Sequence, residues 1–253
     1  MQNHKFIFIG GLHRSGTSLL FQCLREHPQI SGFKNTKAFE DEGQHLQSVY
    51  PPAITFGGAG RFGFNQRSFM DENSELATSE NAEKLFHQWE KYWDIQKPVL
   101  LEKSPPNLVR TRFLQKLFPN SFFIIVLRHP IAVSYATKKW CKNPIHSLVE
   151  HWLRCYEKFN LDREKLQNIF VFKYESFVAN PQMILSQIYS FVELENFPLN
   201  LEVLSNINDK YFSRWHKLKS NKIKNLYASY VESRFEHRIN IFGYSLKNLE
   251  TIE

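Results

Sequence analysis

A glycine-bounded loop near the start of the chain has the residue types and spacing of a phosphate cradle. It runs from Gly11 to Ser18 and reads Gly-Leu-His-Arg-Ser-Gly-Thr-Ser, which is the G-x-x-x-x-G spacing of a P-loop. Its glycines let backbone N–H groups turn towards one anion, and a helix that starts there adds the positive end of its dipole. The position after Gly16 is Thr17, where nucleotide-hydrolysing loops carry lysine, and Arg14 instead places a cation inside the loop. The segment therefore predicts an anion site but does not fix the class of anion.

An arginine and an acidic cluster are the other groups that could do chemistry. Arg128 directly follows the longest apolar stretch, 122–127, and its planar guanidinium suits a bidentate grip on phosphate. Residues 39–45 read Phe-Glu-Asp-Glu-Gly-Gln-His, so three carboxylates and a histidine lie close together. Such groups take a proton from an attacking hydroxyl in general-base catalysis. A solvated acidic turn is the equally weighted alternative.

Short apolar strands alternating with helices are predicted to position these groups. Strands are expected over 6–9, 99–101, 122–127 and 169–172, and helices over about 17–27, 79–94, 107–117 and 145–163, from about 131 and 181, and in the last quarter of the chain. Strands that are apolar on both faces indicate a parallel sheet covered by helices on both sides. Ligands bind such sheets at the carboxyl ends of the strands, which is where the loop and Arg128 fall.

In this order, the segments resemble those of sulfotransferases that use 3′-phosphoadenosine 5′-phosphosulfate (PAPS). The resemblance rests on four pieces between about residues 5 and 192: Arg14-Ser-Gly-Thr-Ser18, the strand and turn ending in Arg128-His-Pro with a helix serine at Ser134, Phe172-Lys-Tyr174-Glu, and Glu102-Lys103-Ser-Pro. The last piece is closer to the protein-tyrosine and bacterial branch. The four pieces together are specific to this family. It implies a three-layer α/β/α, P-loop-like fold with a central parallel sheet, forming a single domain over 1–253.

The resemblance implies a cofactor site on named residues, without a required metal. PAPS would be held at its 5′-phosphosulfate by Arg14, Ser15, Gly16, Thr17 and Ser18, and the product would be 3′,5′-adenosine bisphosphate. Arg128 and a helix serine would hold the 3′-phosphate. The family's serine lies eight residues after the arginine, where this chain has Ala136, so Ser134 is favoured and Thr137 is the alternative. Tyr174 would meet the adenine, although an ordinary aromatic residue at a strand end is nearly as good an interpretation.

Sulfuryl transfer needs cations for the developing charge and a base for the acceptor proton. Arg14 and Lys103 are the candidate cations, since both follow strands and Lys103 matches a lysine of the similar branch. In relatives the base is a Glu or His after the first helix, so the candidates here are Glu40, Asp41, Glu42 and His45. Glu42 and His45 are favoured because residues three apart share a face if a helix starts there.

Residues 31–75 are expected to form an irregular insertion that shapes an acceptor pocket through four aromatic residues, Tyr50, Phe56, Phe62 and Phe64. The acceptor class stays open among small molecules, carbohydrates and lipid head groups. Trp140, Trp152 and Trp215 are interpreted as packing residues.

The chain of 253 residues carries a net charge of +7, of which six cations without any acid lie between 210 and 224. That run is predicted to be a solvated helix face or a segment that closes over the cofactor, since no nucleic-acid module accompanies it.

Three scattered cysteines favour a reducing compartment rather than disulfides or zinc. With no signal-peptide layout and no apolar run long enough to span a bilayer, a cytoplasmic protein is expected. The rival functions are a P-loop kinase, disfavoured by the missing lysine, and a non-catalytic nucleotide-binding protein; the oligomeric state stays open.

Overall fold

The computed structural model describes residues 4–250 and contains a five-stranded sheet in which every strand pair is parallel. The strand order is β2-β3-β1-β4-β5. The strands are β1 (Lys5–Gly11), β2 (Ile30–Gly32), β3 (Val99–Lys103), β4 (Ser121–Leu127) and β5 (Ile169–Lys173). Because β1 lies between β3 and β4, with Ile9 paired to both Lys103 and Ile124, the loop after β1 emerges between the ends of its two neighbours.

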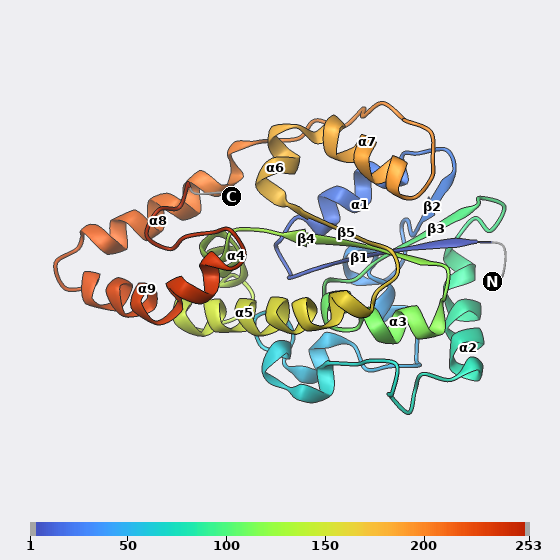
Figure 1. Cartoon of the computed structure of the whole chain (residues 1–253), viewed down its shortest axis with the longest axis horizontal. Helices are drawn as coiled ribbons and strands as arrows, with labels where there is room; N and C mark the ends of the chain where they lie inside the picture. Colours follow the sequence, from blue (N-terminus) through green and yellow to red (C-terminus); the bar gives the residue numbers. More distant parts are fainter. Residues whose placement is uncertain (1–3, 251–253) are drawn as a thin grey trace.

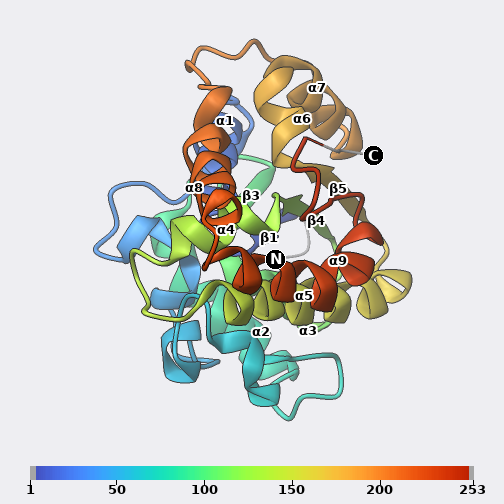
Figure 2. The same cartoon turned by 90° about the vertical axis from the view of Figure 1, so that its left-hand side faces the viewer.

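Helices cover both faces of this sheet. Figures 1 and 2 show α1, α6 and α7 on one face and α2, α3 and α5 on the other, while α8 and α9 form a hairpin beyond the ends of the strands. The helices are α1 (Thr17–Arg25), α2 (Ser79–Trp89), α3 (Thr111–Leu117), α4 (Pro130–Thr137), α5 (Ile145–Asp162), α6 (Tyr174–Ala179), α7 (Pro181–Phe191), α8 (Asp209–Ser220) and α9 (Asn225–Asn240). None of these helices is long and apolar enough to cross a bilayer.

The predicted three-layer α/β fold with a parallel sheet is confirmed, and the differences are local. The edge strand β2 lies within the stretch expected to be irregular, because three residues, Ile-Ser-Gly, carry too little pattern to predict a strand. The helix expected from 107 begins only at Thr111, since Pro105–Val109 forms a 3₁₀ turn. Tyr174 is the first residue of α6 rather than the end of a strand.

Two of the four aromatic residues predicted to line a pocket in the insertion at 31–75 lie in the core. It consists of β2 followed by loops and short 3₁₀ turns. Tyr50 is 3% exposed and Phe62 is fully buried, so these two aromatic side chains pack inside the protein. The expectation that Trp152 and Trp215 are packing residues is confirmed, because both are fully buried.

A buried carboxyl group fastens the insertion to the sheet. Glu102 of β3 is fully buried and accepts hydrogen bonds from the Gly43 backbone N (3.0 Å), the Ser104 hydroxyl (2.5 Å) and the Asn107 amide (2.5 Å). Burial is the main cause that raises the pKa of Glu102 from 4.5 to about 7. The folded state therefore binds this proton more tightly than the unfolded chain does.

This raised pKa predicts a specific pH dependence of stability. The stability that the proton binding contributes is complete below pH 4.5 and is lost as the pH rises through about 7. The unfolding free energy of the wild type minus that of Glu102→Gln should therefore fall by about 3 kcal/mol across that window. Urea titrations at several pH values measure this difference, with Glu83→Gln on the exposed face of α2 as the matched control. Parallel pH curves for the wild type and Glu102→Gln would contradict the prediction.

Candidate active site

A cavity of about 320 Å³ opens at the carboxyl ends of the central strands. Its walls come from the loop after β1 and the start of α1, the acidic loop at residues 40–42, Pro105 after β3, Arg128 after β4, Trp140, Tyr174 at the start of α6, and residues 202–207. The phosphate loop and Arg128, which are more than a hundred residues apart in the sequence, thus face one space.

The phosphate loop turns tightly before α1. Arg14 and Gly16 both have left-handed backbone angles, with φ of 71° and 100°, and the Ser15 N–H donates to the Leu12 carbonyl at 2.9 Å. Arg14, Gly16, Thr17 and Ser18 line the cavity. The Ser15 side chain is buried with its hydroxyl 3.4 Å from the Tyr156 hydroxyl, so it faces the protein interior.

Trp140 supports the arginine of this loop. The guanidinium carbon of Arg14 lies 5.0 Å from the centre of the Trp140 ring, a cation–π contact. Trp140 is 43% exposed and lines the cavity, so its interpretation as a packing residue was wrong. The indole instead holds a cation at the cavity wall.

Arg128 joins the two halves of the predicted site. Its Nη1 donates to the Arg14 carbonyl at 2.8 Å, and its Nε and Nη2 donate to Asn208 Oδ1 at 2.9 and 2.6 Å. The guanidinium carbon lies 4.1 Å from the centre of the Tyr174 ring. Among the described residues, each terminal nitrogen keeps a second N–H for an anion in the cavity. The side chain therefore orients the loop and still presents donors to the cavity.

The contact between Tyr174 and the loop requires glycine at position 16. A Cβ added to Gly16 would lie 2.4 Å from the Tyr174 ring, and the backbone there has a φ of 100°. Gly16→Ala should therefore destabilise the fold by about 1–3 kcal/mol and displace the ring from Arg128. Thermal and urea unfolding measure the loss. In a Tyr174→Ala background the steric part disappears, so the same substitution should cost less there; an equal cost in both backgrounds would contradict the steric explanation.

The acidic loop brings two of the four base candidates to the cavity. Glu40 and Glu42 line it, whereas Asp41 and His45 do not. The Asp41 carboxylate accepts from the backbone N and hydroxyl of Thr36, both at 2.7 Å, so it fixes a turn. Glu42 has extended backbone angles between two 3₁₀ turns, so the helical face expected for Glu42 and His45 does not exist. The two side chains still lie 3.7 Å apart.

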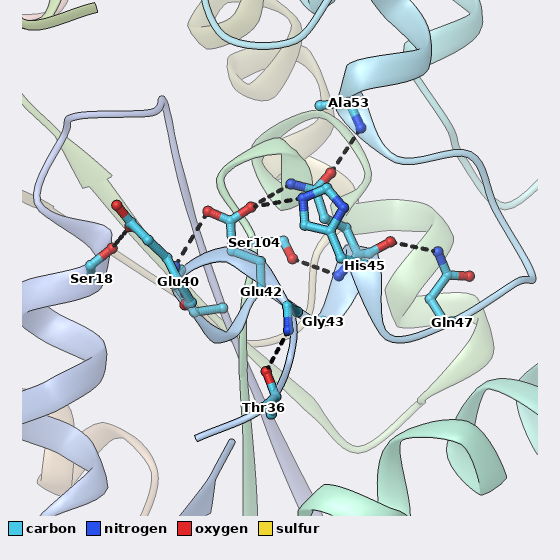
Figure 3. A network of polar contacts seen from close by, with 12 residues as sticks. Ser18, Thr36, Glu40, Glu42, Gly43, His45, Gln47, Ala53 and Ser104 are labelled. Carbon is cyan, nitrogen blue, oxygen red and sulfur yellow. Dashed lines mark hydrogen bonds and ion pairs between the residues drawn. The ribbon is translucent and has the colours of Figure 1, made fainter. Parts of the chain in front are cut away.

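Glu42 is held from three sides, as Figure 3 shows for part of the network. Its carboxylate accepts from the Gln44 amide at 2.5 Å and lies 3.4 Å from Lys103 Nζ and 3.7 Å from His45 Nε2. The Glu40 carboxylate accepts from the Ser18 hydroxyl and lies 3.7 Å from the same lysine. Lys103 is fully buried, donates to the Glu40 carbonyl at 3.0 Å and is absent from the cavity wall. Its ammonium group therefore offsets the negative charge of Glu40 and Glu42 and orients the acidic loop from the buried side.

The helix after Arg128 turns its hydroxyls elsewhere. Ser134 and Thr137 line a small neighbouring space of about 10 Å³, which His13 lines as well, and not the main cavity. The buried Ser134 hydroxyl has no partner among the described residues. The choice between these two residues for a 3′-phosphate stays a prediction.

Sequence reasoning missed two parts of the wall. His13 lines the cavity, lies edge-on to the rings of Phe62 and Trp140 and interacts electrostatically with Glu42. Burial lowers its pKa, so the ring is neutral at pH 7. The only available signal was its place inside the loop. The second part is 202–207, where Glu202, Leu204 and Ile207 line the cavity; none of the lining residues comes from the basic run at 210–224.

The parallel sheet and the cavity between the phosphate loop and Arg128 define a P-loop-like α/β protein. Among the described residues, no cluster of His, Cys, Asp or Glu could hold a metal ion. A model of the sulfotransferase family matches residues 7–198. The chain therefore belongs to the sulfotransferase family.

The chain is also similar to known proteins, to one in sequence and to others in fold. The chain is 25% identical over 217 residues to a putative protein-tyrosine sulfotransferase of Caenorhabditis briggsae, covering 76% of this chain and 66% of that protein. The fold matches a sulfotransferase from Mycobacterium avium with a TM-score of 0.54 at 11% identity, covering 95% of this chain and 77% of that one. It also matches a sulfotransferase domain of the Synechococcus PCC 7002 olefin synthase with a TM-score of 0.52 at 17% identity, covering 83% and 88%.

Proposed function

We propose that this protein transfers the sulfuryl group of PAPS to a hydroxyl or amine acceptor by in-line displacement. The observation that carries the proposal is the 2.8 Å hydrogen bond from Arg128 Nη1 to the Arg14 carbonyl. It joins the phosphate loop and the arginine at one cavity, so one doubly phosphorylated adenosine can meet both. A nucleoside triphosphate would lack the loop lysine that it normally needs.

The residues of the cavity fit the two anionic ends of PAPS. Arg14, Thr17, Ser18 and the backbone at Gly16 would hold the 5′-phosphosulfate, and Arg128 would hold the 3′-phosphate. The Tyr174 ring, already stacked on Arg128, would contact the adenine. When bound, PAPS supplies the sulfuryl group and a phosphate leaving group. Arg14 stabilises the negative charge that develops between them, without a metal ion.

Glu42 is the proposed general base. It lines the cavity and is held by Gln44 and Lys103, so its carboxylate is oriented towards an acceptor hydroxyl. Glu40 already accepts from Ser18, whose hydroxyl the phosphosulfate would require, so it competes less well for the role. Lys103 then acts as a positioning residue, because its contacts are with the two glutamates.

The acceptor and the compartment follow from the remaining features of the chain. The apolar part of the wall, with Trp140, Leu204 and Ile207, suits a small-molecule, carbohydrate or lipid acceptor. All three cysteines are buried and unpaired, which supports a reducing compartment such as the cytoplasm. We propose that the chain forms one catalytic domain.

Two measurements test the proposed function. Calorimetric titration should give tighter binding of 3′,5′-adenosine bisphosphate than of ATP; the opposite order would favour a kinase. A panel of phenol, carbohydrate and lipid acceptors with ³⁵S-labelled PAPS should then yield a labelled product. Tight binding without transfer to any acceptor, and without slow hydrolysis of PAPS, would favour a non-catalytic binding protein.

A further inference from the structure

The α8–α9 hairpin ends in an exposed tip. Its contacts with the rest of the described chain include Leu218, which packs against the core, and Lys219, whose Nζ donates to the Lys247 carbonyl at 3.5 Å. Figures 1 and 2 show the hairpin projecting beyond the sheet, with the connection between α8 and α9 far from the core. We define the hairpin tip as residues 217–226, none of which is buried. The buried residues of the hairpin, such as Trp215 and Val231, lie closer to the body.

The hairpin tip exposes two aliphatic side chains without a structural need for them. Ile223 is 82% exposed and Leu226 is 77% exposed, the highest values among the exposed large apolar residues of the described chain. The turn is fixed by a polar residue, since Asn221 Oδ1 accepts from the backbone N of Ile223 (3.1 Å) and of Lys224 (3.0 Å). A polar residue at 223 or 226 would therefore serve the fold equally well.

Lysines are the neighbours of these two side chains in the sequence of the tip. Lys217, Lys222 and Lys224 are exposed and make no ion pair among the described residues, while Lys219 pairs with Glu232. No acid occurs between 210 and 231. A second copy of the tip would meet the same positive charge, so self-association through it is opposed. An anionic bilayer surface offers phosphates and carboxylates to the ammonium groups and an apolar layer beneath them.

We propose that the hairpin tip docks on anionic lipid bilayers, with Ile223 and Leu226 entering the head-group region and Lys217, Lys222 and Lys224 contacting lipid head groups. This surface is separate from the cavity and independent of the transfer reaction. Two aliphatic side chains bury little apolar area, so docking is reversible and depends on the lysines. At physiological ionic strength, charges more than about 8 Å apart are largely screened, and this distance shortens as salt is added, so binding weakens as salt rises.

Sedimentation with vesicles tests this inference on the full chain. The protein should pellet with vesicles of phosphatidylcholine and phosphatidylserine and remain in solution with phosphatidylcholine alone. Lys222→Glu with Lys224→Glu should lower the partition coefficient at least about tenfold. Ile223→Ser with Leu226→Ser should lower it several-fold and make the remainder more sensitive to salt. These residues are exposed, so unchanged unfolding curves are expected.

Matched variants outside the hairpin tip control for net charge and exposed apolar area. Lys84→Glu with Lys91→Glu changes the charge equally, and Leu161→Ser with Ile241→Ser removes two other exposed aliphatic side chains. Both control proteins should pellet like the wild type. The proposal is overturned if the charge control weakens binding as much as the tip variant, if the serine variant of the tip binds like the wild type, or if anionic vesicles bind nothing. A dimer in light scattering that Ile223→Ser with Leu226→Ser dissolves would also overturn it.

Discussion

Glu42→Gln should lower kcat for sulfuryl transfer by about 10²–10⁴-fold while leaving the affinity for 3′,5′-adenosine bisphosphate nearly unchanged. The glutamine amide keeps the size of the side chain but cannot accept the acceptor proton. Because Glu42 is 2% exposed and faces Lys103 at 3.4 Å, the substitution also leaves a buried ammonium with one partner fewer. Steady-state kinetics with ³⁵S-labelled PAPS and calorimetry with the bisphosphate separate turnover from binding.

Glu40→Gln is the informative comparison, because Glu40 lines the same cavity and lies 3.7 Å from the same lysine. If Glu42 is the base, Glu40→Gln should lose much less turnover. It should also bind the nucleotide as tightly or more tightly, since it removes a negative charge that lies beside the phosphate loop. Glu83→Gln on α2 controls for the loss of one carboxylate elsewhere. A large loss of kcat in Glu40→Gln together with near-normal turnover in Glu42→Gln would reassign the base to Glu40.

The sheet could be predicted because its central strands are buried on both faces and so read as continuous apolar runs. Ser121–Leu127 is buried at every position, and the phosphate loop and Arg128 each follow such a strand. The ends of parallel strands share one edge, so sequence alone placed both groups on the same side of the sheet. The strand order was not readable, and it is the adjacency of β1 and β4 that brings Arg128 within hydrogen-bonding distance of Arg14.

The rest of the site depends on contacts between distant segments. Lys103 and Glu42 are 61 positions apart, and no local pattern indicates that the lysine lies beneath the acidic loop instead of on the cavity wall. The same holds for residues 202–207, which contain no recognisable motif. They line the cavity next to Asn208, whose side chain accepts a hydrogen bond from Arg128. The high positive charge of residues 210–224 suggested that this run closes over the cofactor, but its charged side chains lie towards solvent.

Arg128→Ala should abolish the preference for a 3′-phosphate. In the wild type, 3′,5′-adenosine bisphosphate should bind more tightly than 5′-AMP, because the two differ only in the group that Arg128 would hold. Loss of a charge-assisted contact in a buried site costs about 2 kcal/mol or more, so the ratio of the two dissociation constants should fall by about 30-fold or more. Calorimetric titration of both nucleotides measures this ratio.

The ratio is the decisive quantity because Arg128 also holds the loop. Removing its guanidinium deletes the contacts with Arg14 and Asn208, which should weaken both nucleotides and lower the melting temperature. Arg128→Lys keeps the charge but loses the fork, so it should retain part of the preference. Arg163→Ala, an exposed arginine outside the cavity, should leave both dissociation constants unchanged. If Arg128→Ala weakens both nucleotides equally, the arginine only orients the loop, and the 3′-phosphate must be recognised by another residue.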